Sequence, residues 1–366
     1  MMSGTSLDGV DMALCEFHGD GRECTLLATR TVPYSPWWRR RLSALVGSSA
    51  EEYVLADVEL GRMLGCLAAD FLRETGLRVD AVSSHGHTVF HQPDKGVTTQ
   101  IGDGDAIAAA TGLPVVWRFR QLDVALGGQG APLVPLGDRL LFGNYDACLN
   151  LGGIANVSGL YGNVSIAYDI CPCNQLLNRL AERVGCLYDP QGEYARKGCV
   201  DEPLLCKLEA LDYYRRPAPK SLGKEWVDSQ VWPLLAESSS PVNDLLATVV
   251  HHIVCRVSDA LASFQIPKPA PHRLLLTGGG ARNLFLVETL RTVLSEWELV
   301  VPDNRTVDFK EAVVFALLGY LRLSGQVNIW RSVTGARCDS IGGNVSGLLP
   351  NSWGVQEIQK DNALLI

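Results

Sequence analysis

Several features that would place the chain in a special class are missing from its 366 residues. No uninterrupted apolar run approaches the roughly 20 residues that a membrane-spanning helix needs. No charged segment followed by an apolar stretch marks a secretory signal. The formal net charge of −8 argues against a nucleic-acid backbone as a partner, because phosphates repel an acidic surface. These absences predict a soluble globular protein that binds neither a membrane nor a nucleic acid.

The eleven cysteines follow no disulfide spacing. A chain of this size builds a core without covalent cross-links, so we interpret the cysteines as reduced and the protein as cytoplasmic. The histidines His85, His87 and His91 lie close together, but no cysteine or acid near them completes a zinc site, and we predict hydrogen-bonding roles instead. Cys171 and Cys173 have no second cysteine pair nearby, so small buried fillers are favoured over a metal or redox site. We predict no metal ligands.

Glycine is frequent, with 36 residues, and it marks the turns around which the chain is organised. Within 146–174, a short apolar run ends at Gly152 and Gly153, and two further strand-like runs lead to Asp169. Glycine lets backbone N–H groups approach a phosphate where a Cβ atom would clash, so we predict that this turn binds nucleotide phosphates. Asp169, at the mouth of the third strand, is a candidate general base. The structural alternative is a plain hairpin with a solvated acid at its end.

The amino-terminal segment repeats this order. Its first residues can offer backbone and hydroxyl donors to a nucleotide, and the predicted ligands are Gly4, Thr5, Ser6, Leu7, Asp8, Gly9, Val10 and Asp11. The segment is not a Walker loop, because no Gly-Lys-Ser/Thr follows. Strand-like runs at 10–17 and 24–31 form the hairpin. Only two methionines stand where the other copy has an apolar strand, so we predict that a first strand is missing through truncation or a misplaced start.

The remaining elements complete two copies of one unit. Apolar spacing predicts helices at 51–75, 174–184, 245–264 and 310–323, and strands at 79–84, 114–119 and 273–277. The last strand closes on a third predicted phosphate-binding turn, formed by Gly278, Gly279 and Gly280. We predict a duplicated α/β fold whose lobes are 1–127 and 128–366, with an active cleft between them. A glycine-rich hinge begins at Gly127, and an insertion at about 185–240 carries substrate contacts or a subunit interface.

Long motifs spread over nearly the whole chain resemble the 1,6-anhydro-N-acetylmuramic acid kinase family. They are MSGTSLDGVD (2–11), SSHGHTVFHQP (83–93), QIGDG (100–104), LGGQGAPLVP (126–135), LNLGGIANVS (149–158), LLLTGGGARN (274–283) and EAVVFALLG (311–319). This resemblance implies membership of the actin/Hsp70/sugar-kinase superfamily. Each lobe of such a protein is a ribonuclease-H-like, hexokinase-type unit, which agrees with the duplication inferred above.

The resemblance implies a reaction in which ATP, with Mg²⁺, phosphorylates O6 of 1,6-anhydro-N-acetylmuramate while water opens the anhydro bridge. The product is N-acetylmuramate 6-phosphate, a step of peptidoglycan recycling. The family's ATP loop falls on 4–11 and its catalytic aspartate on Asp169. His87, Arg120 and Glu311 match positions near the sugar, and Arg120 is a cation suited to the lactyl carboxylate. The expected partner is a small amino sugar, and a homodimer is left open.

The residues also allow other readings. Arg120 can form an inter-lobe salt bridge, and Glu311 can be a helix-start acid favoured by the dipole. The chain can be a kinase of another amino sugar or an actin/Hsp70-like ATP-driven binding protein, although nothing after residue 330 is long enough for a peptide-binding module.

The sequence departs from the family pattern at a few positions. The usual D-T-G-P-G-N stretch is here Asp169-Ile170-Cys171-Pro172-Cys173-Asn174. Ile170 and the cysteines do not readily adopt a positive φ, so we expect a backbone that does not need it. His87 replaces a glutamine, and Arg118 replaces an aspartate beside the Phe-Arg pair.

Overall fold

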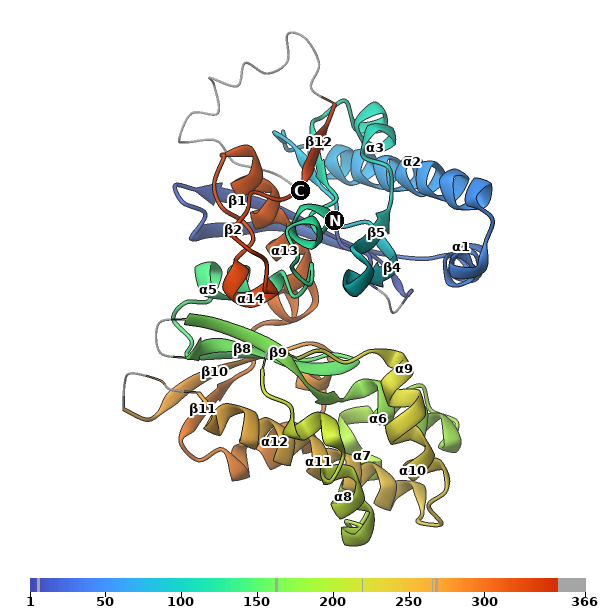
Figure 1. Ribbon diagram of the computed structural model, residues 1–366, viewed down its shortest axis with the longest axis vertical. Coiled ribbons are helices and arrows are strands. Elements are labelled where there is room, and N and C mark those ends of the chain that lie inside the picture. Colours follow the sequence, from blue (N-terminus) through green and yellow to red (C-terminus); the bar gives the residue numbers. More distant parts are fainter. Residues whose placement is uncertain (5–6, 162–163, 219, 265, 267–268, 348–366) are drawn as a thin grey trace. The chain divides into compact units, whose positions relative to one another are not determined.

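A computed structural model describes residues 1–4, 7–161, 164–218, 220–264, 266 and 269–347 (Figure 1). The chain forms two compact units, the first made of Met1–Leu141 with Phe309–Ile366 and the second of Phe142–Asp308. These boundaries differ from the predicted lobes, because the last long helix belongs to the core of the first unit: Phe17 and Tyr320 have ring centroids 5.4 Å apart.

The second unit is built on a five-stranded sheet with the order β11-β10-β7-β8-β9. Its strands are β7 (Ala147–Leu151), β8 (Ile154–Tyr161), β9 (Val164–Pro172), β10 (His272–Thr277) and β11 (Trp297–Val300). The first three strands are antiparallel neighbours, whereas β10 is parallel to both β7 and β11. When these five strands are renumbered 1 to 5 in chain order, the order of the sheet read from β9 to β11 is 3-2-1-4-5. This is the strand order of a ribonuclease-H-like unit, the fold class that we predicted.

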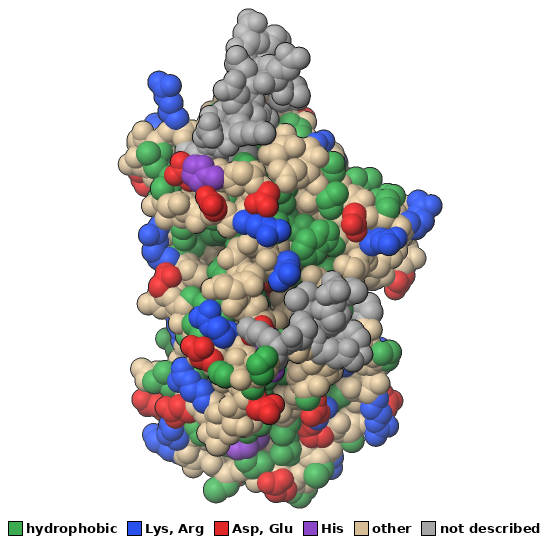
Figure 2. Space-filling view, turned by 90° about the vertical axis from the view of Figure 1, so that its left-hand side faces the viewer, with side chains coloured by type: hydrophobic (Ala, Val, Ile, Leu, Met, Phe, Trp, Pro, Cys, Tyr) green, Lys and Arg blue, Asp and Glu red, His purple; other side chains and the backbone are tan. Residues whose placement is uncertain are grey.

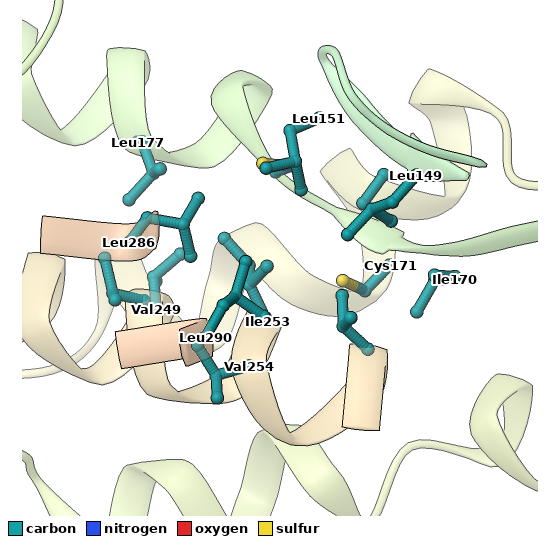
Figure 3. Packing of buried hydrophobic residues seen from close by; sticks show 14 of the residues in the cluster. Leu149, Leu151, Ile170, Cys171, Leu177, Val249, Ile253, Val254, Leu286 and Leu290 are labelled. Carbon is teal, nitrogen blue, oxygen red and sulfur yellow. The ribbon is translucent and has the colours of Figure 1, made fainter. Parts of the chain in front are cut away.

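The core of the second unit lies between this sheet and its helices. Figure 3 shows Leu149 and Leu151 of β7 packed near Ile253 of α11 (Val242–Ala262) and Leu290 of α12 (Leu284–Val293). By length and composition α11 could cross a membrane, a possibility that the sequence did not suggest. However, 67% of its apolar window is buried within the structure, as in the core helix of a soluble protein.

The segment predicted as an irregular insertion at 185–240 is helical and contributes to this core. Leu208, Val227, Val231 and Leu235 are each fully buried. With the neighbouring helices, its elements are α6 (Asn174–Ala181), η3 (Glu182–Val184), η4 (Pro190–Gly192), α7 (Glu193–Arg196), α8 (Glu202–Glu209), η5 (Asp212–Arg215), α9 (Lys224–Trp226), η6 (Val227–Val231) and α10 (Trp232–Ala236).

The first unit has three separate sheets. A hairpin pairs β1 (Gly9–His18) with β2 (Glu23–Pro33), and another pairs β4 (His87–Gln92) with β5 (Val97–Ile101). The third sheet has the order β12-β6-β3. Its strands, and the helices of the unit, are β3 (Val82–Ser83), β6 (Val115–Trp117), β12 (Asn344–Ser346), α1 (Pro36–Ala44), η1 (Leu45–Gly47), α2 (Ala50–Thr75), η2 (Pro93–Lys95), α3 (Gly104–Thr111), α4 (Gln121–Ala125), α5 (Val134–Leu141) and α14 (Arg331–Thr334). The helix α13 (Asn304–Leu323) begins in the second unit and continues into the first.

The first two residues of the chain are held by backbone contacts with two strands of the first unit. Met2 forms an antiparallel bridge with Asp11 of β1, and the amino group of Met1 donates to the carbonyl oxygen of Ser83 in β3 at 2.7 Å. The backbone N–H of His85 donates to the carbonyl oxygen of Met1 at 3.0 Å. The first two residues therefore contact both the β1–β2 hairpin and the end of β3.

The glycine turn that we predicted as a hinge lies inside the first unit and is firmly held. The N–H of Gly130 donates to Oδ2 of Asp123 at 2.7 Å, and the hydroxyl of Thr334 donates to Oδ1 of the same carboxylate at 2.6 Å. Asp123 is fully buried. The division between the compact units falls at Leu141 and Phe309 instead.

Candidate active site

Asp169 lies within β9, opposite Asn156 of β8. Its carboxylate oxygen Oδ2 accepts a hydrogen bond from the backbone N–H of Leu222 at 2.8 Å. Its backbone carbonyl accepts from the Tyr213 hydroxyl at 2.6 Å, and its own N–H donates to the carbonyl of Lys220 at 3.1 Å. Residues 213–222, which we call the clamp, therefore hold this aspartate at three points, and it is not a solvated acid at the end of a plain hairpin.

The environment of Asp169 changes its acidity. Burial disfavours the charged carboxylate and raises the pKa of Asp169 to about 6, while the hydrogen bond from the Leu222 N–H opposes that rise. An acid with this pKa is mostly ionised at neutral pH yet basic enough to accept a proton from water. The other carboxylate oxygen, Oδ1, has no partner within the part of the chain that the structure describes.

The clamp is fixed in turn by aromatic residues. The ammonium group of Lys220 donates to the carbonyl of Tyr213 at 3.3 Å and lies 4.8 Å from the centroid of the Tyr213 ring. Tyr213 contacts Tyr214 edge to face, and the Tyr214 hydroxyl is 2.9 Å from Nε2 of the buried His252. No pattern in the sequence indicated these partners, beyond the general prediction that 185–240 carries substrate contacts or a subunit interface.

The two predicted phosphate-binding turns of this unit lie together. Gly152 follows β7 and Gly278 follows β10, and since these strands are parallel neighbours, both turns lie at the same edge of the sheet. The side-chain amide of Asn174 donates to the carbonyl of Leu151 at 2.8 Å. A Cβ atom on Gly280 would lie 2.7 Å from that of Leu151, so the turns are in direct contact.

Packing explains the glycine at some of these positions and not at others. Gly278 has a φ of 79°, and a Cβ there would lie 2.5 Å from Oδ1 of Asn150. By contrast, an added Cβ would lie 3.3 Å from its nearest neighbour at Gly152, 4.0 Å at Gly153 and 3.5 Å at Gly279, and none of these three has a positive φ. The fold does not demand glycine at these three positions, as expected where a ligand approaches the backbone closely.

In the first unit, the predicted nucleotide loop is shorter than we expected. Thr5 and Ser6 lie outside the described residues, and Leu7 has a positive φ of 58°. Gly9, Val10 and Asp11 belong to β1, and Asp8 precedes it. A Cβ on Gly9 would lie 2.4 Å from the carbonyl oxygen of Val32, so strand pairing explains this glycine. Of the described residues in this segment, Gly4, Leu7 and Asp8 lie outside β1.

His87 begins β4 and is 5% exposed. Burial lowers the pKa of His87 to about 4, opposed by a backbone hydrogen bond with Gly4, so the imidazole is neutral. Its Nδ1 has no hydrogen-bond partner among the described residues. The structure thus brings one predicted sugar-binding residue next to the predicted nucleotide loop.

Arg120 is anchored to a neutral histidine. Its Nε and Nη2 donate to Nε2 of His85 at 3.1 and 2.9 Å, and Nη1 donates to the carbonyl of Gly130 at 2.8 Å. Burial and the nearby Arg120 hold the pKa of His85 well below its usual value. Burial also lowers the pKa of Arg120 to about 10, which leaves it cationic at neutral pH. In the described part of the chain, no ion pair of this guanidinium is found.

Glu311 lies well inside α13, which begins at Asn304 rather than at 310. Its explanation as a helix-start acid is therefore wrong. The Asp303 carboxylate begins the helix instead, accepting from the N–H of Thr306 at 3.1 Å. The side chain of Glu311 reaches solvent, but desolvation by the surrounding protein raises its pKa, opposed by Lys310 and Arg120. Arg120 and Glu311 thus lie within electrostatic range of each other.

The departures from the family's aspartate motif have a structural counterpart. β9 continues through Ile170 and Cys171, and Ile154 and Ala155 of β8 pair with Pro172 and Cys171. As predicted, no residue of 170–173 has a positive φ, and Cys171 and Cys173 are fully buried. No group of three or more His, Cys, Asp or Glu within the described residues could hold a metal ion.

On the face drawn in Figure 2, basic and acidic side chains are interspersed.

Comparison with known proteins identifies the family. The family model for anhydro-N-acetylmuramic acid kinase matches residues 1–347. The anhydro-N-acetylmuramic acid kinase of Gloeobacter violaceus is 39% identical, over 92% of this chain and 94% of its own length. The kinase of the same name from Haemophilus influenzae is 36% identical, over 92% of this chain and 94% of its own.

Solved structures of lower similarity were also found. The activator of 2-hydroxyisocaproyl-CoA dehydratase from Clostridium difficile, with bound ADPNP, is 14% identical with a TM-score of 0.40, covering 84% of this chain and 93% of that one. Hexokinase from Schistosoma mansoni, complexed with glucose, is 11% identical with a TM-score of 0.34, covering 84% and 86%. From its sequence relatives and the match across nearly its whole length, the chain belongs to the anhydro-N-acetylmuramic acid kinase family.

Proposed function

We propose that the protein uses ATP and water to convert 1,6-anhydro-N-acetylmuramate into N-acetylmuramate 6-phosphate, as a step in peptidoglycan recycling. Membership of the family, over residues 1–347, supports the overall reaction. The observation that carries the mechanism is the clamped Asp169, whose pKa of about 6 suits a general base. We further propose a cytoplasmic location, where ATP is available.

In the proposed mechanism Asp169 removes a proton from a water molecule. The water oxygen forms a bond to C1 of the sugar while the bond between C1 and O6 breaks. The electron pair released on O6 attacks the γ-phosphorus of ATP, and ADP leaves. The Leu222 N–H occupies Oδ2, so Oδ1 is the oxygen that faces the water. General base catalysis of this kind contributes a factor of about 10²–10⁴.

The glycine turns are the proposed phosphate ligands. Backbone N–H groups at Gly152, Gly153 and Gly278–Gly280, together with the loop 4–8, would bind the ATP phosphates. Mg²⁺ is proposed to enter with the nucleotide, because the described residues offer no protein cage and this ion commonly binds through phosphates and water. Its chemistry is to neutralise the phosphate charge during transfer.

Arg120 is the proposed ligand of the lactyl carboxylate. Two of its five N–H bonds remain after those to His85 and Gly130, which is enough for a carboxylate. His87 and Glu311 are the further proposed sugar ligands.

The activity is tested by incubating the protein with ATP, Mg²⁺ and a panel of amino sugars, and following ADP release and product mass. We expect ADP release that depends on 1,6-anhydro-N-acetylmuramate and a product whose mass equals that of the sugar plus one phosphoryl group and one water. Release with N-acetylglucosamine alone would favour a kinase of another amino sugar. Release that needs no sugar would favour an ATP-driven binding protein. Light scattering of the same sample distinguishes a homodimer from a monomer.

The pH dependence of kcat/KM should report the base. Because burial raises the pKa of Asp169, its carboxylate becomes protonated as the pH falls through about 6, and the protonated acid cannot accept a proton from water. We expect kcat/KM to fall about tenfold per pH unit below that value. A pH profile of kcat/KM for the wild-type enzyme measures this fall. If kcat/KM began to fall only near pH 4, the assignment of Asp169 as the general base would be contradicted.

Arg120→Met should impair recognition of the lactyl group selectively. A hydrogen bond to a charged group contributes about 1.5–3 kcal/mol, so kcat/KM for 1,6-anhydro-N-acetylmuramate should fall about 10–150-fold. 1,6-Anhydro-N-acetylglucosamine lacks the lactyl group, and its kcat/KM should change far less. Equal losses with both sugars would instead indicate a structural role through His85.

A further inference from the structure

The β4–β5 hairpin of the first unit has a row of polar side chains on one face. Thr88 pairs with Gln100 and His91 with Thr98, so these four side chains share a face of the hairpin. Gln100 is 4% exposed and Thr98 is 5% exposed. Polar groups buried to this extent normally have hydrogen-bond partners, and each exception calls for an explanation.

One atom in this row is an exception. The amide nitrogen Nε2 of Gln100 donates to the Thr98 hydroxyl oxygen at 2.9 Å, and that oxygen is 3.1 Å from Nδ1 of His91. The amide nitrogen is thus turned toward the Thr98 hydroxyl. The carbonyl oxygen Oε1 is then buried without a hydrogen-bond partner among the described residues. A buried acceptor left unpaired costs about 1–3 kcal/mol, which a ligand that donates to it would recover.

The location of Gln100 connects it to the proposed sugar site. A Cβ atom on Gly86, which lies between His85 and His87, would be 3.6 Å from Cβ of Gln100. His85 is the residue that anchors Arg120. The charge of Arg120 also contributes to lowering the pKa of His91, after the larger effect of burial, so the guanidinium lies within electrostatic reach of the row.

The proposed substrate has few groups that could serve such an acceptor. Its C1 and C6 are joined through the single oxygen O6 of the anhydro bridge and its O3 carries the lactyl ether, so its neutral donors are the acetamido N–H and the 4-hydroxyl. An amide N–H can only donate, and Gln100 Oε1 can only accept. A hydroxyl can do either and is served equally well by an imidazole such as that of His87.

We infer that Gln100 is a specificity-determining residue, whose Oε1 accepts a hydrogen bond from the acetamido N–H of the sugar. The inference rests on the proposed function. Thr98 is a positioning residue, since its hydroxyl holds the amide nitrogen and so turns the oxygen toward the substrate. In this arrangement the cation Arg120 binds the lactyl carboxylate, and the neutral acceptor Gln100 binds the neighbouring acetamido group.

The test is a double-mutant cycle in enzyme and substrate. Gln100→Met has a side chain of similar length without the acceptor, and the substrates are 1,6-anhydro-N-acetylmuramate and its 2-deoxy analogue, which lacks the acetamido group. We expect the substitution to lower kcat/KM about 5–150-fold for the full substrate and to leave the analogue almost unaffected. Gln100→Asn, which keeps the amide but shortens its reach, should behave in the same way.

The controls separate this inference from the proposed function and from misfolding. Thr99→Val alters the opposite face of β5 and should change both substrates alike. Equal losses with both substrates in Gln100→Met and Gln100→Asn, or selective loss only against a 4-deoxy analogue, would overturn the inference. A wild-type enzyme that fails to phosphorylate 1,6-anhydro-N-acetylmuramate would overturn the proposed function itself, before any variant is compared.

Discussion

Asp169→Asn should lower kcat by about 10²–10⁴-fold while the KM for ATP stays close to the wild-type value. The asparagine amide has the same size and its oxygen can still accept from the Leu222 N–H, so the clamp should remain in place. What is lost is the ability to accept a proton from water. Steady-state ADP release with 1,6-anhydro-N-acetylmuramate measures the effect, and a nucleotide-binding titration checks that ATP still binds.

Asp212→Asn is the matched control for this substitution. Asp212 is 89% exposed in its side chain and lies next to Tyr213 of the clamp, and its one ion pair within the described residues is with Arg215 at 3.6 Å. A surface ion pair of this kind contributes little to stability, so the control should retain wild-type turnover. Near-normal turnover in Asp169→Asn would mean that another group activates the water.

Gly153→Ala should weaken ATP binding about 10–100-fold and leave the thermal stability of the protein almost unchanged. A Cβ at this position lies 4.0 Å from its nearest neighbour and the backbone has no positive φ, so the fold accommodates alanine. The added methyl group would instead obstruct the approach of a phosphate to the backbone N–H groups. Isothermal titration with ATP gives the affinity and a thermal melt gives the stability.

Two further glycine substitutions are controls for this prediction. Gly47 has open space around an added Cβ and no positive φ, so Gly47→Ala should change neither property. Gly278 has a φ of 79° and a Cβ there would meet Asn150, so Gly278→Ala should lower the melting temperature as well as the affinity. If Gly153→Ala bound ATP normally, the turn after β7 would not be a phosphate ligand.

Local patterns were sufficient to predict most of the second unit. Glycines 152 and 153 end one strand-like run, and the runs that follow became β8 and β9. The predicted third strand was too short, because Cys171 and Pro172 continue the pairing with β8, and Ile170 and Cys171 are buried. Asp169 therefore lies inside the strand rather than after it.

The partners of Asp169 could not be predicted in this way. Tyr213 and Leu222 lie 44 and 53 residues further along the chain, and contacts over such separations leave no periodic signal in the sequence. The same applies to the boundary of the units. α13 looked like the end of the second lobe, but its apolar residues Val314 and Leu317 are buried with Phe17 in the first unit.

Gln100 illustrates a different limit of prediction from the sequence. The motif around residue 100 was recognised as part of the family pattern, yet only the three-dimensional structure reveals that its amide oxygen is buried with no hydrogen-bond partner among the residues described. A sequence gives the identity of a polar side chain but not whether its hydrogen bonds are satisfied, because this depends on neighbours from several strands.

The clamp separates the position of Asp169, the proposed general base, from the strength of that base. The strand determines where Asp169 stands, whereas burial and the Leu222 N–H, supplied by a segment far along the chain, determine at which acidity it works. Relatives that keep the same sheet but carry a different segment there would thus be free to operate in more acidic or more alkaline surroundings. Adaptation of the enzyme to its host's internal pH could proceed without altering a single residue of the sheet.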